Sequence, residues 1–152
     1  MDVSFRRAGE ADLPAIVGLL AADGLGRNRE RPGPPPDPAY LEAFRRMERH
    51  PDNFYLLACK GDEVVGCLQL TFIDGLSRLG ARRAQIEGVR VHPNQRGAGI
   101  GEALFREAIE QAKRAGCSLV QLTTDKQRGD AHRFYERFGF EASHVGMKLK
   151  LG

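Results

Sequence analysis

The sequence predicts an α/β (α+β) fold in which one sheet is flanked by helices. Short alternating runs of apolar residues are typical of half-buried strands, and longer stretches with apolar residues three or four positions apart are typical of amphipathic helices. The two kinds of segment follow each other in the order β-α-α-β-β-β-α-β-α-β. A chain of 152 residues has the length of one domain with a sizeable core, so we expect a single domain over residues 1–152.

The first third of the chain is expected to hold one strand and two helices. The alternating run Val3–Phe5 predicts the first strand. A helix with apolar residues at positions 13, 16, 17 and 20 follows, with Asp12 as its expected N-cap. Residues 23–38 lose this periodicity and are rich in Gly and Pro, which indicates a long loop, and residues 39–49 form the second helix. Three arginines in the loop either remain solvated or attract an acidic substrate.

The middle of the chain predicts an antiparallel hairpin and a fourth strand. Asn53–Cys59 and Val64–Ile73 are apolar runs separated by a Gly61-Asp62 turn, the usual signature of a hairpin. Ala84–His92 is the next strand, and Pro93-Asn94 ends it.

A glycine-rich turn then opens the longest predicted helix. Gly97, Gly99 and Gly101 stand at alternate positions, and a helix with one apolar face runs from Ile100 towards Gly116. The first N–H groups of a helix have no partner within it and lie at the positive end of its dipole. We therefore expect an anion site here, best suited to phosphate.

The last third predicts two more strands with a helix between them. Ser118–Thr124 is nearly all apolar, as is usual for a strand at the centre of a sheet. Asp130 is expected to cap a short helix that ends at Gly139. Phe140–Leu149, with Val145, Met147 and Leu149 alternating, is expected to form the closing strand.

The glycine run does not fit two common phosphate loops, because Glu102 stands where a dinucleotide fingerprint has its last Gly and no Lys follows the glycines. Arg96-Gly97-Ala98-Gly99-Ile100-Gly101, after Gln95 and a Val-x-Val strand end, resembles the pyrophosphate loop of the GNAT superfamily of acetyl-CoA-dependent N-acetyltransferases. Residues 131–140 resemble that family's Ala-x-x-Phe-Tyr-x-x-x-Gly-Phe segment. The resemblance implies a mixed, mostly antiparallel sheet. It also implies acetyl-CoA as co-substrate, without a metal, bound by Val89, Arg90, Val91, Gln95, Arg96, Gly97, Ala98, Gly99, Ile100, Gly101, Asp125, His132 and Phe134. Asp125 stands where an asparagine is common.

Tyr135 is the candidate general acid. The resemblance places this tyrosine beside the cofactor sulfur, and a phenol with an ordinary pKa of about 10 holds a proton at neutral pH that it can deliver to a departing thiolate. Spacing alone favours a core aromatic beside Phe134 and Phe138, and the resemblance reverses this preference.

Glu87 is the candidate general base. An amine must lose its proton before it can attack, and simple alternation puts this carboxylate on the face of Val89 and Val91. The resemblance places a catalytic glutamate at this point of the strand. Gly88 is a candidate bulge that would redirect the side chain, and a salt bridge with Arg82, Arg83 or Arg90 is the alternative role. His92 and Asp125 are the reserve candidates.

The composition of the chain limits the classes of molecule that it is expected to bind. The net charge of +3 suits a small anionic ligand but is too low to indicate nucleic acid, and no apolar run approaches the roughly 20 residues of a membrane span. Cys59, Cys67 and Cys117 have no metal or redox spacing, and no signal peptide is visible, so a cytoplasmic protein is expected. An N-acetyltransferase acting on an amine is the favoured function, with a non-catalytic acyl-CoA-binding or sensing module as the alternative. A homodimer is compatible with the sequence.

Overall fold

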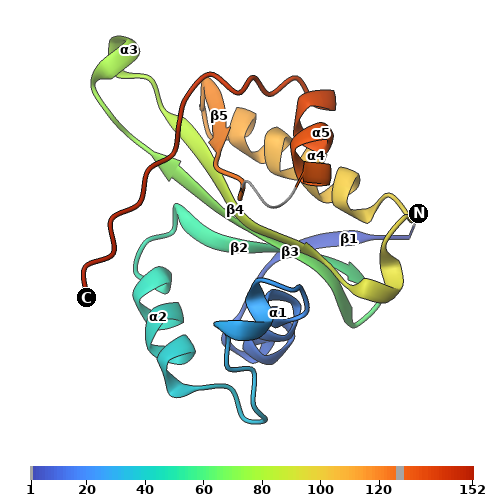
Figure 1. Ribbon diagram of the computed structural model, residues 1–152. Helices are drawn as coiled ribbons and strands as arrows, with labels where there is room; N and C mark the ends of the chain where they lie inside the picture. Colours follow the sequence, from blue (N-terminus) through green and yellow to red (C-terminus); the bar gives the residue numbers. More distant parts are fainter. Residues whose placement is uncertain (1, 126–128) are drawn as a thin grey trace.

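One five-stranded sheet forms the framework of the molecule. The computed structural model describes residues 2–125 and 129–152 (Figure 1). The strands lie in the order β1-β2-β3-β4-β5; the first four pair antiparallel and β5 pairs parallel to β4. Their bounds are β1 Ser4–Arg7, β2 Asn53–Lys60, β3 Glu63–Ile73, β4 Arg83–Val91 and β5 Leu119–Leu122. The mixed, mostly antiparallel α+β sheet that the sequence predicts is confirmed.

Helices cover both faces of this sheet. In Figure 1, α1 (Leu13–Ala21) and α2 (Pro38–Glu48) lie on one side of it, and α4 (Ile100–Arg114) and α5 (Gly129–Arg137) lie on the other. These helices match the predicted segments closely. A short turn that the sequence did not predict, α3 (Ser77–Gly80), joins β3 to β4. Within the described residues, no helix has both the length and the apolar character needed to cross a bilayer.

Asp12 is the N-cap residue of the first helix, as predicted, but its side chain makes no capping bond to α1. Its carboxylate instead accepts hydrogen bonds from the backbone N–H of Gly9, at 2.7 Å, and from the guanidinium of Arg6. This carboxylate therefore closes the 3₁₀ turn Glu10–Asp12 that leads into α1, and the hydrogen bond from Arg6 holds the pKa of Asp12 below its ordinary value.

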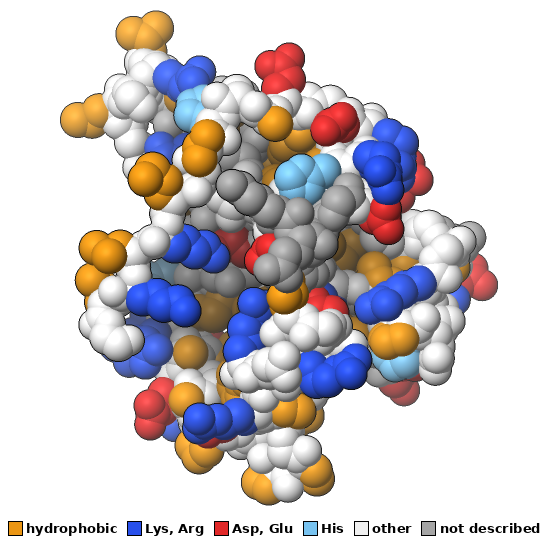
Figure 2. Space-filling model, viewed as in Figure 1, with side chains coloured by type: hydrophobic (Ala, Val, Ile, Leu, Met, Phe, Trp, Pro, Cys, Tyr) orange, Lys and Arg blue, Asp and Glu red, His pale blue; other side chains and the backbone are white. Residues whose placement is uncertain are grey.

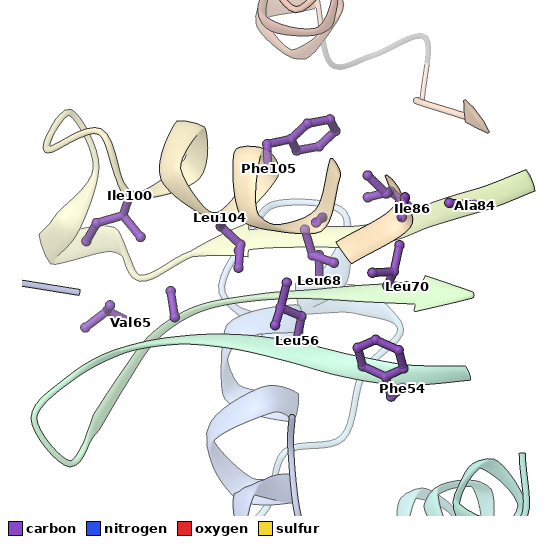
Figure 3. Close-up of a cluster of buried hydrophobic side chains, with 13 residues drawn as sticks. Phe54, Leu56, Val65, Leu68, Leu70, Ala84, Ile86, Ile100, Leu104 and Phe105 are labelled. Atoms are coloured by element: carbon purple, nitrogen blue, oxygen red, sulfur yellow. The ribbon is translucent and has the colours of Figure 1, made fainter. Parts of the chain in front are cut away.

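Two apolar layers hold the sheet between its helices. The larger lies under α4, where Leu104 points towards Leu68 and Leu56 of the central strands, whereas Phe105 points away from the sheet (Figure 3). The smaller lies under α1 and joins its apolar face to the opposite face of β2 and β3. Alternation along β2 and β3 produces both layers, because successive side chains point to opposite faces.

Two predictions about the C-terminal third are wrong. The strand predicted at the sheet centre is β5, which lies at the edge with β4 as its neighbour. The predicted closing strand Phe140–Leu149 does not form, because residues 140–152 follow α5 without entering the sheet. Alternation specifies that a segment is strand-like, but a strand also needs a partner edge, and the described part of the chain does not bring one to this segment.

Candidate active site

The turn between β4 and α4 has the geometry of an anion site. Gly97 and Gly99 adopt φ values of 84° and 79°, in the left-handed region that favours glycine, and Gly99 is the N-cap of α4. Residues 96–99 are exposed, and the first N–H groups of α4 that follow them have no partner within the helix. The side chain of Gln95, by contrast, accepts a hydrogen bond from Lys60 Nζ at 2.8 Å. The predicted phosphate loop thus combines free donors, a helix dipole and a backbone that glycine alone adopts easily.

Beside this turn, β4 and β5 separate. Their pairing runs from Arg83 opposite Leu119 to Ile86 opposite Leu122, whereas β4 continues to Val91. Among the described residues, no strand therefore covers the β5-side edge of β4 beyond Ile86. This uncovered edge lies at Val89–Val91, a segment that the resemblance implies in acetyl-CoA binding.

A bulge at Gly88 redirects Glu87. Gly88 has φ of 59°, and the pairing of β3 with β4 shifts register at this point. Val89 and Val91 pack with the layer under α4, whereas Glu87 lies opposite Gln69 on the face that carries α1 and α2. The prediction from simple alternation, that Glu87 shares a face with these valines, is therefore wrong.

Glu87 is exposed and forms no ion pair with another described residue. Two of the three arginines proposed as its partners have other contacts. Arg82 donates to Asp52 and Asp74 at 2.7 and 3.1 Å. Arg90 pairs with Asp23 at 3.0 Å. This arrangement leaves the carboxylate of Glu87 accessible to a ligand on its face.

Tyr55 is a site residue that the sequence analysis missed. A Cβ placed on Gly88 would lie 3.9 Å from the Tyr55 hydroxyl. Burial raises the pKa of Tyr55, and the charges of Cys67 and Glu87 raise it further. Tyr55 also lines a cavity of about 220 Å³ between α2 and β2, together with Phe44, Met47 and others. The sequence feature that could have pointed to Tyr55 is an aromatic residue with a hydroxyl group within an otherwise apolar strand.

The predicted residues of α5 lie on the opposite face, against α4. Phe105 of α4 is the centre of an aromatic cluster, with its ring centroid 5.6 Å from that of Phe134 and 5.4 Å from that of Tyr135. His132, one turn earlier, has a buried Nε2 with no hydrogen-bond partner among the described residues. Such a buried polar atom needs a partner, and a bound ligand can supply it.

The remaining candidates lie around the same opening. Asp125 is exposed just beyond the end of β5. His92 follows β4, and its Nδ1 accepts a hydrogen bond from the N–H of Asn94 at 3.2 Å. Tyr135 and Glu87 therefore belong to opposite faces of the sheet. Ligands bound on the two faces of the sheet can contact each other where β4 and β5 separate.

Comparison with known proteins agrees with this arrangement. The family model described as the acetyltransferase (GNAT) family matches residues 25–140. The chain is 37% identical over 106 residues to the aminoalkylphosphonate N-acetyltransferase of Salmonella typhimurium, covering 70% of this chain and 68% of that protein. It is 30% identical to the glucosamine 6-phosphate N-acetyltransferase of Trypanosoma brucei brucei, covering 99% and 97%.

A solved structure is also similar over nearly the whole chain. The crystal structure described as a transcriptional regulator from Bacillus halodurans C-125 has 51% identity and a TM-score of 0.95, and the match covers 98% of this chain and 99% of that one. The family match extends from the loop after α1 to the end of α5, and so contains the glycine turn and both candidate catalytic residues. This chain belongs to the GNAT family of acetyltransferases.

Proposed function

We propose that residues 1–152 form one N-acetyltransferase domain that transfers an acetyl group from acetyl-CoA to a primary amine of a small molecule or peptide by direct attack. The observation that carries the proposal is the exposed glycine turn at the start of α4, next to the uncovered edge of β4. This turn can hold a pyrophosphate, and the adjoining edge can hold an extended arm by backbone hydrogen bonds.

The residues present fit acetyl-CoA. The open N–H groups at the start of α4 are donors for the pyrophosphate, and Val89–Val91 provide the backbone edge for the pantetheine arm. The buried Nε2 of His132 is a polar group in need of a partner on the α5 side. Bound acetyl-CoA supplies an activated acetyl thioester.

Glu87 and Tyr135 then have complementary roles. Glu87 accepts a proton from the ammonium form of the acceptor, directly or through water, and the amine nitrogen forms a C–N bond to the acetyl carbonyl carbon. The C–S bond breaks, and Tyr135 donates its proton to the departing thiolate. The second proton that the nitrogen loses as the amide forms passes through water to the Tyr135 phenolate, which restores the phenol. The acceptor approaches from the face of α1 and α2, where Glu87 and Tyr55 lie.

Small amines that carry an acidic group are the first acceptors to test. Both N-acetyltransferase relatives are named for amines that carry a phosphonate or phosphate. The arginines of the 23–38 loop could attract such an acidic group, so the acceptor panel should pair amines with and without one.

A non-catalytic acyl-CoA-binding or sensing module is the second candidate. It is favoured by the description of the Bacillus halodurans relative as a transcriptional regulator. Such a module needs the glycine turn but neither Glu87 nor Tyr135.

Release of free thiol from acetyl-CoA, measured across the amine panel, tests the proposal. We expect turnover with at least one amine. Glu87→Gln should lower kcat most at neutral pH and recover partly at high pH, because the amine then loses its proton to solvent. Calorimetry should show unchanged CoA affinity in this variant. Binding of CoA without turnover on any amine would favour the sensing module, and wild-type rates for Glu87→Gln at every pH would move the base to His92 or Asp125.

A further inference from the structure

Arg90 lies deeper in the molecule than the other arginines that form ion pairs. Lys and Arg side chains stand out over the face of the molecule that Figure 2 shows. In the other ion pairs between described residues, the arginine side chain is between 22% exposed, in Arg82, and 80% exposed, in Arg31. The side chain of Arg90 is 10% exposed, and that of its partner Asp23 is 15% exposed. A guanidinium at this depth has lost most of its water, so its protein contacts must replace that water.

The guanidinium of Arg90 contacts two groups from different parts of the chain. Its Nε lies 3.0 Å from Oδ2 of Asp23, which follows the end of α1. Its Nη1 donates to the backbone carbonyl of Val89 at 2.9 Å. One rigid fork of donors therefore joins the start of the 23–38 loop to a carbonyl of β4.

This Val89 carbonyl points to the uncovered edge of β4. The N–H of His92 donates to the Val65 carbonyl of β3 at 2.8 Å, so the C=O of the same peptide, which belongs to Val91, points away from β3. Backbone groups alternate between the two edges of a strand, so Arg90 is turned to β3 like His92. The C=O of Val89 and the N–H of Val91 are therefore neighbours on the edge that β5 leaves uncovered.

A buried ion pair is not needed merely to hold the loop against β4. The cost of removing two charges from water offsets most of their attraction, and two apolar side chains of similar volume are often at least as stabilising. An apolar side chain at position 90, however, could not donate to the Val89 carbonyl. This hydrogen bond is the feature that the charged pair adds.

The hydrogen bond from Arg90 changes what the uncovered edge offers to a ligand. A free carbonyl oxygen at Val89 would repel the oxygen of any ligand carbonyl that approached the neighbouring N–H of Val91. The positive charge of the guanidinium on the Val89 oxygen offsets this repulsion. The edge next to the glycine turn is thereby suited to a ligand carbonyl, such as that of an acetyl thioester.

We propose that Arg90 is a positioning residue for acetyl transfer: held by Asp23, its guanidinium caps the Val89 carbonyl, so that the neighbouring N–H of Val91 holds the acetyl carbonyl oxygen of acetyl-CoA. This inference rests on the proposed function. Arg90 acts through the backbone and does not itself touch the acetyl group. A donor fixed at the acetyl oxygen also favours attack by the amine, because negative charge develops on that oxygen in the transition state.

Infrared difference spectra of bound, isotope-labelled acetyl-CoA test this arrangement without any acceptor amine. A hydrogen bond weakens a C=O bond, so the wild-type protein should lower the stretching frequency of the acetyl carbonyl. Asp23→Asn/Arg90→Met removes the cap and both charges, keeps an oxygen for the N–H of Gly26, and should lose most of this shift. Calorimetry should show unchanged affinity for free CoA, because the glycine turn stays intact and free CoA has no acetyl group.

Asp23→Asn alone is the matched control, and it separates positioning from stability. It keeps Arg90 beside the Val89 carbonyl but removes the negative charge that faces the guanidinium, so it should be less stable than the double variant. It should nevertheless retain more of the carbonyl shift. With an accepted amine, kcat should fall by about tenfold or more in the double variant, as expected for loss of a hydrogen bond to a charged group, and by less in Asp23→Asn.

The outcomes distinguish this inference from the proposed function. A wild-type protein that binds acetyl-CoA without lowering the carbonyl frequency would overturn the role of Arg90 and leave acetyl-CoA binding standing. The wild-type frequency in the double variant would overturn it too, as would losses of shift and kcat that follow the order of stability, since a purely structural ion pair predicts that order. A wild-type protein that binds no acetyl-CoA would refute the proposed function, and this inference with it.

Discussion

At the scale of single residues, Tyr135 combines a packed aromatic ring with a polar hydroxyl. Its ring lies 5.4 Å from Phe105 and 5.5 Å from Phe134, so the aromatic part belongs to the cluster between α4 and α5. The ring is half-buried rather than enclosed. An aromatic side chain with a polar tip can thus be held rigidly by its ring while the hydroxyl performs a separate task.

Tyr135→Phe separates these two roles. The variant keeps the ring and deletes only the hydroxyl, so folding and CoA affinity should change little. If the phenol protonates the departing thiolate, kcat and kcat/KM should fall together by about 10²–10⁴-fold, because the proton transfer matters in the transition state. Steady-state kinetics across pH measures this, and the high-pH limb of the profile should disappear. Near-normal kcat in a folded Phe variant would leave Tyr135 with a packing role alone.

At the scale of elements, the glycines at the start of α4 have different structural requirements. Gly97 and Gly99 have left-handed φ values, so a side chain at either strains the backbone whatever the site binds. Gly101 lies within the helix, and a Cβ there would meet Val91 Cγ2 at an ordinary 3.5 Å. Gly101 is therefore the glycine at which ligand binding can be tested without backbone strain.

Gly101→Ala should stabilise the fold and weaken binding. Replacing Gly by Ala in a helix raises the free energy of unfolding by up to about 1 kcal/mol. The added methyl group should lower CoA affinity if the pyrophosphate approaches the backbone closely. Gly18→Ala is the matched control, since Gly18 lies in α1 with nothing within 4 Å of an added Cβ. Thermal unfolding and calorimetry distinguish the two effects, and equal CoA affinity in both variants would argue against the glycine turn as the pyrophosphate site.

At the scale of the whole molecule, one ion pair ties the 23–38 loop to the sheet. Asp23 and Arg90 meet at 3.0 Å with side chains that are 15% and 10% exposed. Asp23 Oδ1 also accepts the N–H of Gly26 at 2.5 Å, and Gly26 is packed so closely that a Cβ there would lie 1.8 Å from the carbonyl oxygen of Leu20. The start of this loop, which the sequence indicates only by its lack of periodicity, is therefore fixed against β4, beside the bulge that directs Glu87.

Removing this ion pair should destabilise the protein far more than removing a surface pair. Asp23→Asn keeps the oxygen that accepts from Gly26 but removes the negative charge that faces the buried guanidinium of Arg90, which should lower the free energy of unfolding by about 3 kcal/mol. Glu110→Gln is the control, because the Glu110–Lys113 pair at 3.3 Å is mostly exposed and its loss should cost below about 0.5 kcal/mol. Chemical denaturation measures both. Similar values for the two variants would show that the loop is held by packing instead.

Local patterns in the sequence determined most of the elements and the kind of site. The hairpin at Gly61-Asp62 and the amphipathic face of α4 follow from side-chain period, which depends only on neighbouring residues. Gly97 and Gly99 are identifiable for the same reason, since a left-handed backbone at a helix start favours glycine. The segment of Tyr135 was recognised by its resemblance to a family, and its catalytic role stays a prediction.

The tertiary structure determined the features that depend on contacts between residues distant in the chain. The bulge at Gly88 turned Glu87 to the face opposite Val89, because register is set by pairing with β3 and not by β4 itself. Contacts between distant segments also bring Tyr55 close to Gly88 and pair Asp23 with Arg90. The tertiary structure also left β5 at the sheet edge and residues 140–152 outside the sheet. A sequence specifies which segments are strand-like, but each strand forms only where backbone groups of another segment arrive to pair with it.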